Sequence, residues 1–559
     1  MSLTKVSYSM ITGACVNVID FGAKGDGITN DTAAIQAAVD SLSANGGAVY
    51  FPKGTYKVVP PTATTGCIWV RYNNITLFGD GASSSRITTG TSNSAVPIHV
   101  CSNNDLSVLP SSISTPILNF VCRDLAINGS GVPEYFALAY GRGVLLRVVT
   151  NAIVENCFVT NMSMIGICSE GGNGKFLVNG NIVTNCFYSA INYNGRSYQS
   201  IISNNICFGS NISVNSTAIQ AVGFCTIENN TVYGSPGDYA NCGGIMWGEG
   251  PYSGVGIISG NIVKHCRFGI KTIYTGPCTI TDNLIVNCLT SGGIVLVGGT
   301  ATSFPVGSTD NIVANNTLIN NYPTQIDCSA PNSTINGNRL LGNYVAVNPA
   351  GPTEPDAIIT VIPEISIAID SNYCAITSNI INGSIRGIVQ TEGKILGVVA
   401  NNDMYAVSAG NMAVATTSSV ICATTALVNR IADGTGNYQS QIITSTKPTE
   451  GFWNAGDIWN RYPLVTGSTL GAVVLAVVST TTTATAAAGA TSITTAAAPS
   501  AAAGNILGIQ LDNGSYHWTT TTSVVGATVN FSAAIPTGRS VANGAKVYGQ
   551  QWRDLAVLA

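Results

Sequence analysis

Short apolar runs alternate with Gly- and Asn-rich turns over most of the first 400 residues. Runs such as Leu177-Val178 and Ile182-Val183 have the length of β-strands and are too short for helices. Asparagines recur between these runs at spacings of 25, 24, 25, 31, 22, 33, 22, 41 and 23 residues. The recurring residues are Asn156, Asn181, Asn205, Asn230, Asn261, Asn283, Asn316, Asn338, Asn379 and Asn402. A unit of 22 to 25 residues with three longer steps indicates a solenoid that carries insertions.

The length of this unit predicts a parallel β-helix. About three short strands fit into one unit, and successive coils of such a fold stack at the ~4.8 Å inter-strand spacing. An Asn at each turn can adopt left-handed backbone angles and bond to the Asn of the next coil. The three longer steps predict loops at residues 233–254, 297–310 and 343–370. Structured excursions of this kind are favoured places for function.

The two ends of the chain differ from the repeat. Near the N-terminus, Asn30 or Asp31 is expected to cap a helix whose apolar face is Ile35, Ala38, Val39 and Leu42, and this helix can cover the open end of the solenoid. After residue 404 the Asn spacing stops. The stretch Thr480–Ala503 is nearly all small residues, which predicts a flexible or weakly packed link near residues 480–500. The expected domains are a leader (1–15), β-helix entry and cap (16–115), a parallel β-helix with insertions (116–410), a C-terminal β region (411–480) and a sandwich-like β domain (481–559).

Composition excludes several classes of function. There are 23 Lys and Arg against 27 Asp and Glu, and charged residues make up only 9% of the chain, which argues against a nucleic-acid partner. The longest apolar run, Leu470 to Val478, is about half of the ~20 residues that a spanning helix needs, so no membrane insertion is expected. The N-terminus lacks the layout of a signal peptide. No Cys or His spacing suggests a metal, and the 16 cysteines are expected to be reduced, with Cys186, Cys266 and Cys288 in one column.

Three segments resemble known proteins. Residues 20–39, DFGAKGDGITNDTAAIQAAV, followed by residues 46–56, GGAVYFPKGTY, look like the entry segment of the pectate-lyase-like right-handed parallel β-helix superfamily. Lys5–Ile11 resembles the leader of bacteriophage tailspikes, and the region from Gly456-Asp457-Ile458 to His517-Trp518 is similar to tailspike C-termini. The resemblance implies an all-β homotrimer with a C-terminal trimerisation region. It also implies a virion-tail location, attachment to a phage tail or baseplate protein, and depolymerisation of a bacterial surface polysaccharide such as O-antigen, capsule or exopolysaccharide.

Acidic residues near aromatic side chains are the candidates for chemistry. Glycoside hydrolysis needs two carboxyl groups, one of them held protonated. The insertion at 233–254 contains Asp238 and Glu249, which we predict as the acid/base pair, with Glu170 and Asp327 as replacements and no cofactor. Glu170 lies three coils before Glu249, about 14 Å along the axis at the sheet spacing. The residues expected to contact sugar are Tyr193, Arg196, Tyr198, Trp247, Tyr252, Lys271 and Tyr274.

Two other functions fit the same residues. A polysaccharide lyase would use Lys271 or Tyr274 as the base that abstracts a proton alpha to a uronate carboxyl. A binding-only adhesin or structural fibre would hold glycan in the same groove without cleaving it. In a purely structural interpretation, the aromatic residues pack the insertion and its acidic residues only solvate it. For His99, His265 and His517 we predict structural roles, with His265 at a turn position equivalent to Asn185 and Asn287.

Overall fold

A computed structural model describes the chain in twenty segments. These are residues 15–90, 95–129, 141–171, 174–194, 200–208, 216–234, 242–248, 254–273, 276–298, 309–342, 365–370, 374–382, 386–390, 399–400, 402–405, 427–432, 438–444, 458–461, 471–497 and 503–554. The chain divides into a first unit, Met1–Ser333 with Tyr344–Val361, and a second unit, Thr334–Asn343 with Ile362–Ala559. This division falls inside the predicted β-helix, and the five-part division expected from the sequence stays a prediction.

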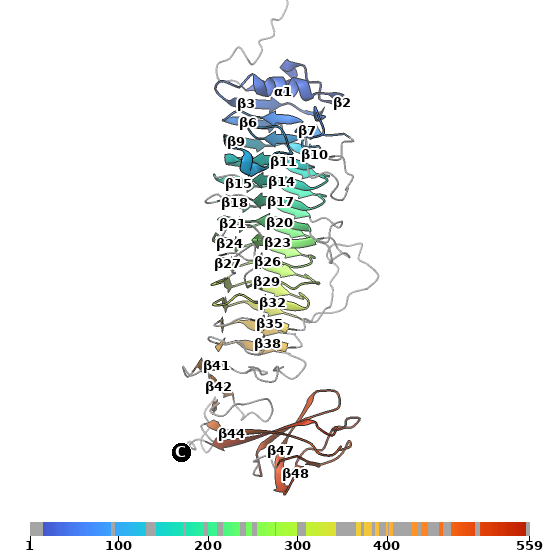
Figure 1. Cartoon of the computed structure of the whole chain (residues 1–559), viewed down its shortest axis with the longest axis vertical. Coiled ribbons are helices and arrows are strands. Elements are labelled where there is room, and N and C mark those ends of the chain that lie inside the picture. Colours follow the sequence, from blue (N-terminus) through green and yellow to red (C-terminus); the bar gives the residue numbers. More distant parts are fainter. Residues whose placement is uncertain are drawn as a thin grey trace, which may run out of the picture. The chain divides into compact units, whose positions relative to one another are not determined.

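Each coil of the first unit contributes one strand to each of three parallel sheets, as the repeat length predicted (Figure 1). Sheet 1 contains β1 (Val16–Asn17), β3 (Gly47–Phe51), β6 (Ile75–Gly79), β9 (Ile117–Arg123), β12 (Val149–Glu155), β15 (Phe176–Asn179), β18 (Ser200–Ser203), β21 (Cys225–Glu228), β24 (Gly256–Ser259), β27 (Cys278–Thr281) and β30 (Ile312–Ala314). Sheet 2 contains β2 (Asp26–Asn30), β4 (Gly54–Lys57), β7 (Ser85–Thr88), β10 (Ala126–Asn128), β13 (Phe158–Thr160), β16 (Ile182–Thr184), β19 (Ile206–Phe208), β22 (Thr231–Tyr233), β25 (Ile262–Lys264), β28 (Leu284–Val286) and β31 (Thr317–Ile319). Sheet 3 contains β5 (Ile68–Val70), β8 (Ile98–Val100), β11 (Arg142–Arg147), β14 (Ile165–Glu170), β17 (Ser189–Asn194), β20 (Ser216–Ala221), β23 (Cys242–Gly248), β26 (Ile270–Ile273), β29 (Ile294–Val297) and β32 (Thr324–Cys328).

Buried asparagines link the coils between sheets 1 and 2. In this Asn ladder, each Nδ2 donates to the Oδ1 of the next member, for example from Asn181 to Asn205 and from Asn205 to Asn230, both at 2.9 Å. The members in the first unit are Asn181, Asn205, Asn230, Asn261, Asn283 and Asn316. The predicted vertical alignment is confirmed, and the ladder satisfies backbone groups that the turn would otherwise bury unpaired.

Two details of the predicted ladder were wrong. Cys157 occupies the ladder position predicted for Asn156, because its backbone N–H donates to Asn181 Oδ1 at 2.9 Å. The left-handed backbone angles belong to the residue before each ladder Asn, such as Asn204 (φ 55°) and Asn229 (φ 54°). The turn therefore needs two residues, because one makes the bend and the next bonds along the axis. His265 (φ 57°) does match Asn185 and Asn287 in a second turn, as predicted.

The insertion predicted at 233–254 is not one loop. β23 (Cys242–Gly248) lies inside it and pairs in register with β20 and β26, so the surplus residues are divided between the two flanking segments. The predicted loop at 343–370 likewise contains β35 (Ile365–Ile369). The spacing of asparagines reports the length of a coil but not where in the coil the extra residues stand.

The helix α1 (Thr32–Asp40) covers the first strand of sheet 3, as predicted for a cap. The Gln36 side chain accepts a bond from Trp69 N at 2.9 Å and donates to Trp69 O at 3.0 Å, so it satisfies the edge of β5. Asp31 precedes the helix but bonds elsewhere, because its carboxylate accepts from Lys24 N and Gly25 N. Within the described segments, the other short helices are 3-10 turns, η2 (Val18–Phe21) and η3 (Pro110–Ser112).

The second unit begins with further coils and ends in an antiparallel β domain. The coil strands are β33 (Thr334–Asn336), β34 (Arg339–Leu341), β35 (Ile365–Ile369), β36 (Ala375–Thr377), β37 (Ile380–Asn382), β38 (Arg386–Gln390), β39 (Val399–Ala400) and β40 (Asp403–Tyr405). The later strands are β41 (Leu427–Ala432), β42 (Tyr438–Thr444), β43 (Ile458–Arg461), β44 (Gly471–Thr481), β45 (Ser492–Thr494), β46 (Ile506–Gln510), β47 (Tyr516–Val525), β48 (Thr528–Phe531) and β49 (Lys546–Asp554). The expected strand, Asn-Gly turn and strand at 506–518 are confirmed as β46 and β47.

The stretch predicted as a flexible link is part of this β domain as far as residue 497. Ile493 lies in a core with Leu507, Ile509 and Val529, and β45 pairs with β48. Ala and Thr residues are compact enough to let neighbouring strands approach, so a small-residue composition did not mean a loosely packed segment here.

The fifteen cysteines within the described residues are all free thiols, which agrees with the predicted reduced state. Among these same residues, none of the helices has both the length and the apolar character needed to cross a membrane.

Candidate functional site

Sheet 3 presents a row of side chains on its outer face, and this row is the candidate site. Successive strands place in register Cys168, Asn192, Gln220, Met246, Lys271, Val295 and Asp327. Residues alternate between faces along each strand, so the residues before and after each of these point into the coil. Two predicted site residues, Lys271 and Asp327, thus belong to one row. They lie two strands apart, about 10 Å at the ~4.8 Å spacing.

Two aromatic residues predicted to contact sugar point inward instead. Tyr193 is 1% exposed and Trp247 is fully buried. The Tyr193 ring stacks on Phe176 with centroids 5.2 Å apart, and Trp247 Nε1 donates to Gly223 O at 3.2 Å. Neither ring is exposed to stack on a sugar in this conformation, which argues against the predicted binding role of these two residues. The direction of each ring is set by its position along the strand, because successive residues face opposite sides of the sheet. Closeness to other aromatic residues in the sequence does not reveal this direction.

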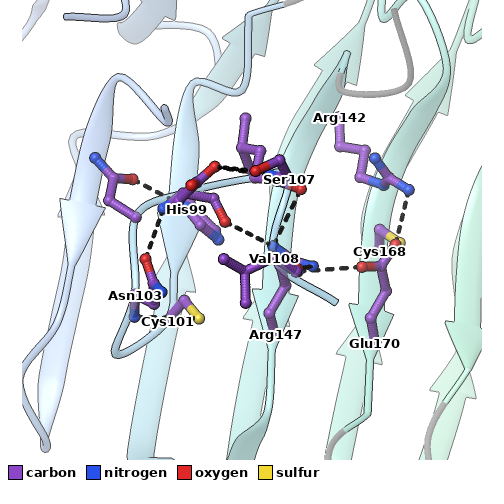
Figure 2. Close-up of polar contacts among 12 residues, drawn as sticks. His99, Cys101, Asn103, Ser107, Val108, Arg142, Arg147, Cys168 and Glu170 are labelled. Atoms are coloured by element: carbon purple, nitrogen blue, oxygen red, sulfur yellow. Dashed lines mark hydrogen bonds and ion pairs between the residues drawn. The ribbon is translucent and has the colours of Figure 1, made fainter. Parts of the chain in front are cut away.

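Glu170 forms ion pairs at the end of β14 (Figure 2). Its Oε1 lies 2.7 Å from Arg142 Nη2, and its Oε2 lies 3.3 Å from Arg147 Nε. A general acid has to present its carboxyl group to the glycosidic oxygen, whereas both carboxyl oxygens of Glu170 are engaged by guanidinium groups of the protein. The contacts therefore argue against Glu170 as the proton donor. Glu170 also stands three strands before β23, as its coil count predicted.

Arg147 connects this carboxylate to the segment that follows β8. Its guanidinium donates to the carbonyls of Asp105, Leu106 and Val108, and its side chain is 4% exposed. Leu106 in turn packs with Leu145, Ile165 and Cys168 on the outer face of sheet 3. The Arg–Glu–Arg cluster thus holds a covering loop on the first strands of sheet 3.

Replacing Glu170 by Gln is expected to destabilise the first unit rather than to stop catalysis. Removing one member of a largely buried ion cluster leaves uncompensated charge, which costs about 2–4 kcal/mol after allowance for the partial exposure. Chemical denaturation of Glu170→Gln should show this loss, while Glu155→Gln, at the end of β12, should be near neutral. Normal stability with abolished polysaccharide cleavage would instead return Glu170 to the catalytic residues.

His99 lies beneath the same loop. Its Nδ1 is 3.0 Å from Asn104 Oδ1, an oxygen that also accepts from Gly66 N, so the neutral ring carries its proton on Nδ1. Burial lowers the pKa of His99 to about 4, the charges of Arg147 and Arg142 act in the same direction, and the bond to Asn104 opposes them. The expected structural role agrees with these contacts.

Acid is expected to destabilise the first unit through His99. Because the pKa is lower in the folded chain than the ~6.5 of an unfolded His, protonation favours unfolding. The neutral, buried His99 ring makes its full contribution to the free energy of unfolding above about pH 6.5. This contribution falls by about 3 kcal/mol as the pH decreases toward about 4. Unfolding measured at both ends of this range should show less pH dependence for His99→Gln than for the wild-type chain. Equal pH dependence would contradict this assignment.

The other predicted site residues lie outside the described residues. They are Asp238, Glu249, Arg196, Tyr198, Tyr252 and Tyr274. The chain positions of two of them are informative, because Asp238 comes four residues before β23 and Glu249 directly follows its last residue, Gly248.

One polar pair on the outer face was not predicted from the sequence. Asn192 Nδ2 donates to Gln220 Oε1 at 3.1 Å, and the pair lies in the same row as Lys271. Counting alternate residues from the buried Ile191 and Ile219 would have placed both side chains on this face. This amide pair and Lys271, which stands two strands beyond Gln220, supply hydrogen-bond donors and acceptors suited to sugar hydroxyls.

Two family models match the chain. One, described as rhamnogalacturonase A/epimerase, pectate lyase-like, covers residues 15–246, and one described as a right-handed β-helix region covers residues 189–355. Each model covers less than half of the chain, and together with the three-sheet coil the matches show the right-handed parallel β-helix fold.

Similarity to individual proteins is local in sequence and extensive in fold. The mannuronan C5-epimerase AlgE1 of Azotobacter vinelandii is 34% identical over 116 residues, which are 20% of this chain and 8% of that protein. Alginate lyase 7 of the same organism is 49% identical over 67 residues, 12% of this chain and 8% of the lyase. The chain thus spans under a tenth of these two relatives. The fold is also similar to that of a tailspike protein variant of E. coli bacteriophage HK620 in complex with a pentasaccharide. The TM-score is 0.51 at 13% identity, and the match covers 98% of this chain and 96% of the tailspike chain.

Proposed function

We propose that the chain is a bacteriophage tailspike that binds a bacterial surface polysaccharide and cleaves it by endoglycosidic hydrolysis. The observation that carries this proposal is the fold similarity to the HK620 tailspike, because it extends from the β-helix through the C-terminal β domain. The leader and C-terminal resemblances support the same class. A homotrimer on a phage tail or baseplate protein, located in the virion tail, follows from this proposal.

The outer face of sheet 3 is the proposed polysaccharide surface. Its row of Asn192, Gln220, Lys271 and Asp327 offers polar contacts along several coils, which suits a polymer better than a small ligand. Asp238 and Glu249 adjoin the middle strand of this surface, β23, in the chain. In the proposed reaction one of these carboxyls protonates the leaving glycosidic oxygen, and the other activates a water or attacks the sugar. If one of these two carboxyls is not catalytic, Asp327 is the preferred substitute, because it lies in the same outer row of sheet 3.

Incubation with purified surface polysaccharide tests the proposal. We expect the polymer to shorten, with a mass gain of one water for each bond cleaved. Intact polymer after prolonged incubation with polysaccharides from a broad set of hosts, together with binding of glycan, would favour the adhesin alternative and contradict the enzyme.

A polysaccharide lyase is the second candidate function. The sequence relatives that carry the names mannuronan C5-epimerase and alginate lyase favour it. Lys271 stands on the outer face of sheet 3, with Nζ 5.6 Å from the centroid of the Phe268 ring, where a base could reach a bound polymer. Elimination leaves an unsaturated uronate, so new ultraviolet absorbance without a gain of water would favour the lyase over the hydrolase.

A further inference from the structure

A separate pocket opens where sheet 3 turns into sheet 1 near the N-terminal cap. Its volume is about 320 Å³, within the range of small-ligand sites. The segment after α1, the β5–β6 turn and both ends of the loop after β8 line it. The lining residues are Ser43, Ala44, Asn45, Gly46, Arg71, Tyr72, Asn73, Asn74, Ser102, Thr115, Pro116 and Ile117. The pocket lies six strands of sheet 3 before β23, roughly 29 Å at the ~4.8 Å spacing.

Arg71 is held in place at this pocket. Its Nη2 lies 3.0 Å from Asp40 Oδ2, and its Nε donates to the Tyr72 hydroxyl at 2.8 Å. Its guanidinium also lies 4.4 Å from the centroid of the Trp69 ring. Two of the five guanidinium N–H groups are used by Asp40 and Tyr72, so three more can donate to a ligand. A fixed arginine of this kind loses little side-chain entropy on binding.

The two asparagines of the β5–β6 turn use their oxygens within the protein. Asn73 Oδ1 accepts from Leu118 N at 2.8 Å, and Asn74 Oδ1 accepts from Asn119 Nδ2 at 2.8 Å. Each of these amides therefore retains its NH₂ group as the part that can serve a ligand. Ser102 Oγ donates to Thr115 O at 2.8 Å and so joins the two ends of the loop after β8. Arg71, Asn73 and Asn74 thus offer N–H donors, while the side-chain oxygens of both asparagines are already occupied.

We infer that this pocket binds a carboxylate-bearing sugar residue of an acidic polysaccharide. An ionised carboxylate only accepts hydrogen bonds, so it matches the donors of Arg71, Asn73 and Asn74 better than a neutral sugar hydroxyl does. The Arg71 guanidinium lies 5.2 Å from the centroid of the Tyr72 ring, and the opposite face of this ring is the apolar surface offered to the sugar. The inference rests on the proposed polysaccharide substrate and deepens it, because it names acidic glycans and places a subsite away from sheet 3's middle strands.

Calorimetric titration of the full chain with tetramannuronate, a polyuronate probe, tests this subsite. We expect binding to the wild-type chain and weaker binding of cellotetraose, its neutral counterpart. Asn73→Asp keeps the oxygen that accepts from Leu118 N but replaces the amide donor by a negative oxygen. It should weaken tetramannuronate binding by at least about tenfold, the order expected from loss of one charge-assisted bond.

Matched variants separate the pocket from general effects on charge or folding. Arg71→Gln should also weaken tetramannuronate binding, while Arg539→Gln, which removes an exposed arginine 3.9 Å from Asp512 in the second unit, should not. Circular dichroism should report an unchanged fold for Asn73→Asp. No binding to the wild-type chain, equal affinity for cellotetraose, or unchanged affinity in Asn73→Asp would overturn the inference. Polymer cleavage is measured separately, so failure of the subsite and failure of the depolymerase are distinguishable.

Discussion

Asn230→Ala is expected to lower the free energy of unfolding of the first unit by about 3–6 kcal/mol, because several buried groups lose partners at ~1–3 kcal/mol each. Asn230 Oδ1 accepts from both the backbone N and the Nδ2 of Asn205 at 2.9 Å. Its own Nδ2 donates to Ile202 O at 2.8 Å and to Asn261 Oδ1 at 3.0 Å. The site is 1% exposed, so water cannot replace these bonds without local opening. Guanidinium unfolding of the wild-type and variant chains measures the difference.

The neighbouring residue provides the matched control. Asn229 is exposed and has φ 54°, and glycine stands at the equivalent positions 180 and 260. Asn229→Gly should therefore change stability little. Equal losses for Asn229→Gly and Asn230→Ala would show that the turn as a whole, rather than the ladder contact, carries the stability.

Glu249→Gln is expected to reduce polysaccharide cleavage about 10²–10⁴-fold, the usual contribution of a positioned acid or base. Glutamine preserves the size of the side chain and its capacity to bond sugar, but it cannot transfer a proton. The KM for the polymer should change much less than kcat. Asp238→Asn should have an effect of similar size if the two carboxyls act as a pair.

A turn carboxylate serves as the control for this experiment. Asp282 has φ 58° at a position where Asn204 and Asn229 stand in other coils, so Asp282→Asn fits the backbone and should retain full activity. Loss of less than about tenfold in both Glu249→Gln and Asp238→Asn would rule out the pair, since a general acid or base contributes more than that. Asp327→Asn would then be the next variant to measure.

The repeat made the coil predictable, but it did not determine which way each side chain faces. Asn181 to Asn402 could be aligned because a buried amide ladder requires an asparagine at the same place in each coil, even where the coil carries extra residues. The register error at Asn156 arose because two adjacent turn positions both accept asparagine, one for its left-handed backbone and one for its amide. The sequence also could not show that β23 lies inside the predicted insertion. Extra residues on both sides of a strand increase the distance in sequence between two ladder asparagines just as a single loop would.

The candidate site was predictable only in part for the same reason. Lys271 and Asp327 were named from their chemistry, and the structure adds that they share one outer row of sheet 3. Tyr193 and Trp247 were named from their proximity to the insertion, yet one residue of offset along a strand turns each ring into the core. The ion pairs of Glu170 depend on Arg142 and Arg147, which stand 28 and 23 residues earlier in sequence and meet it only through the parallel register.

A crystal structure of the Glu249→Gln chain soaked with oligosaccharide from a cleaved host polymer tests the central claim most directly. The claim predicts sugar rings along the outer face of sheet 3, in contact with Lys271 and with the Asn192–Gln220 pair, and with residue 249 beside a glycosidic oxygen. Sugar bound on the outer face of sheet 1 or sheet 2, with sheet 3 bare, would contradict it.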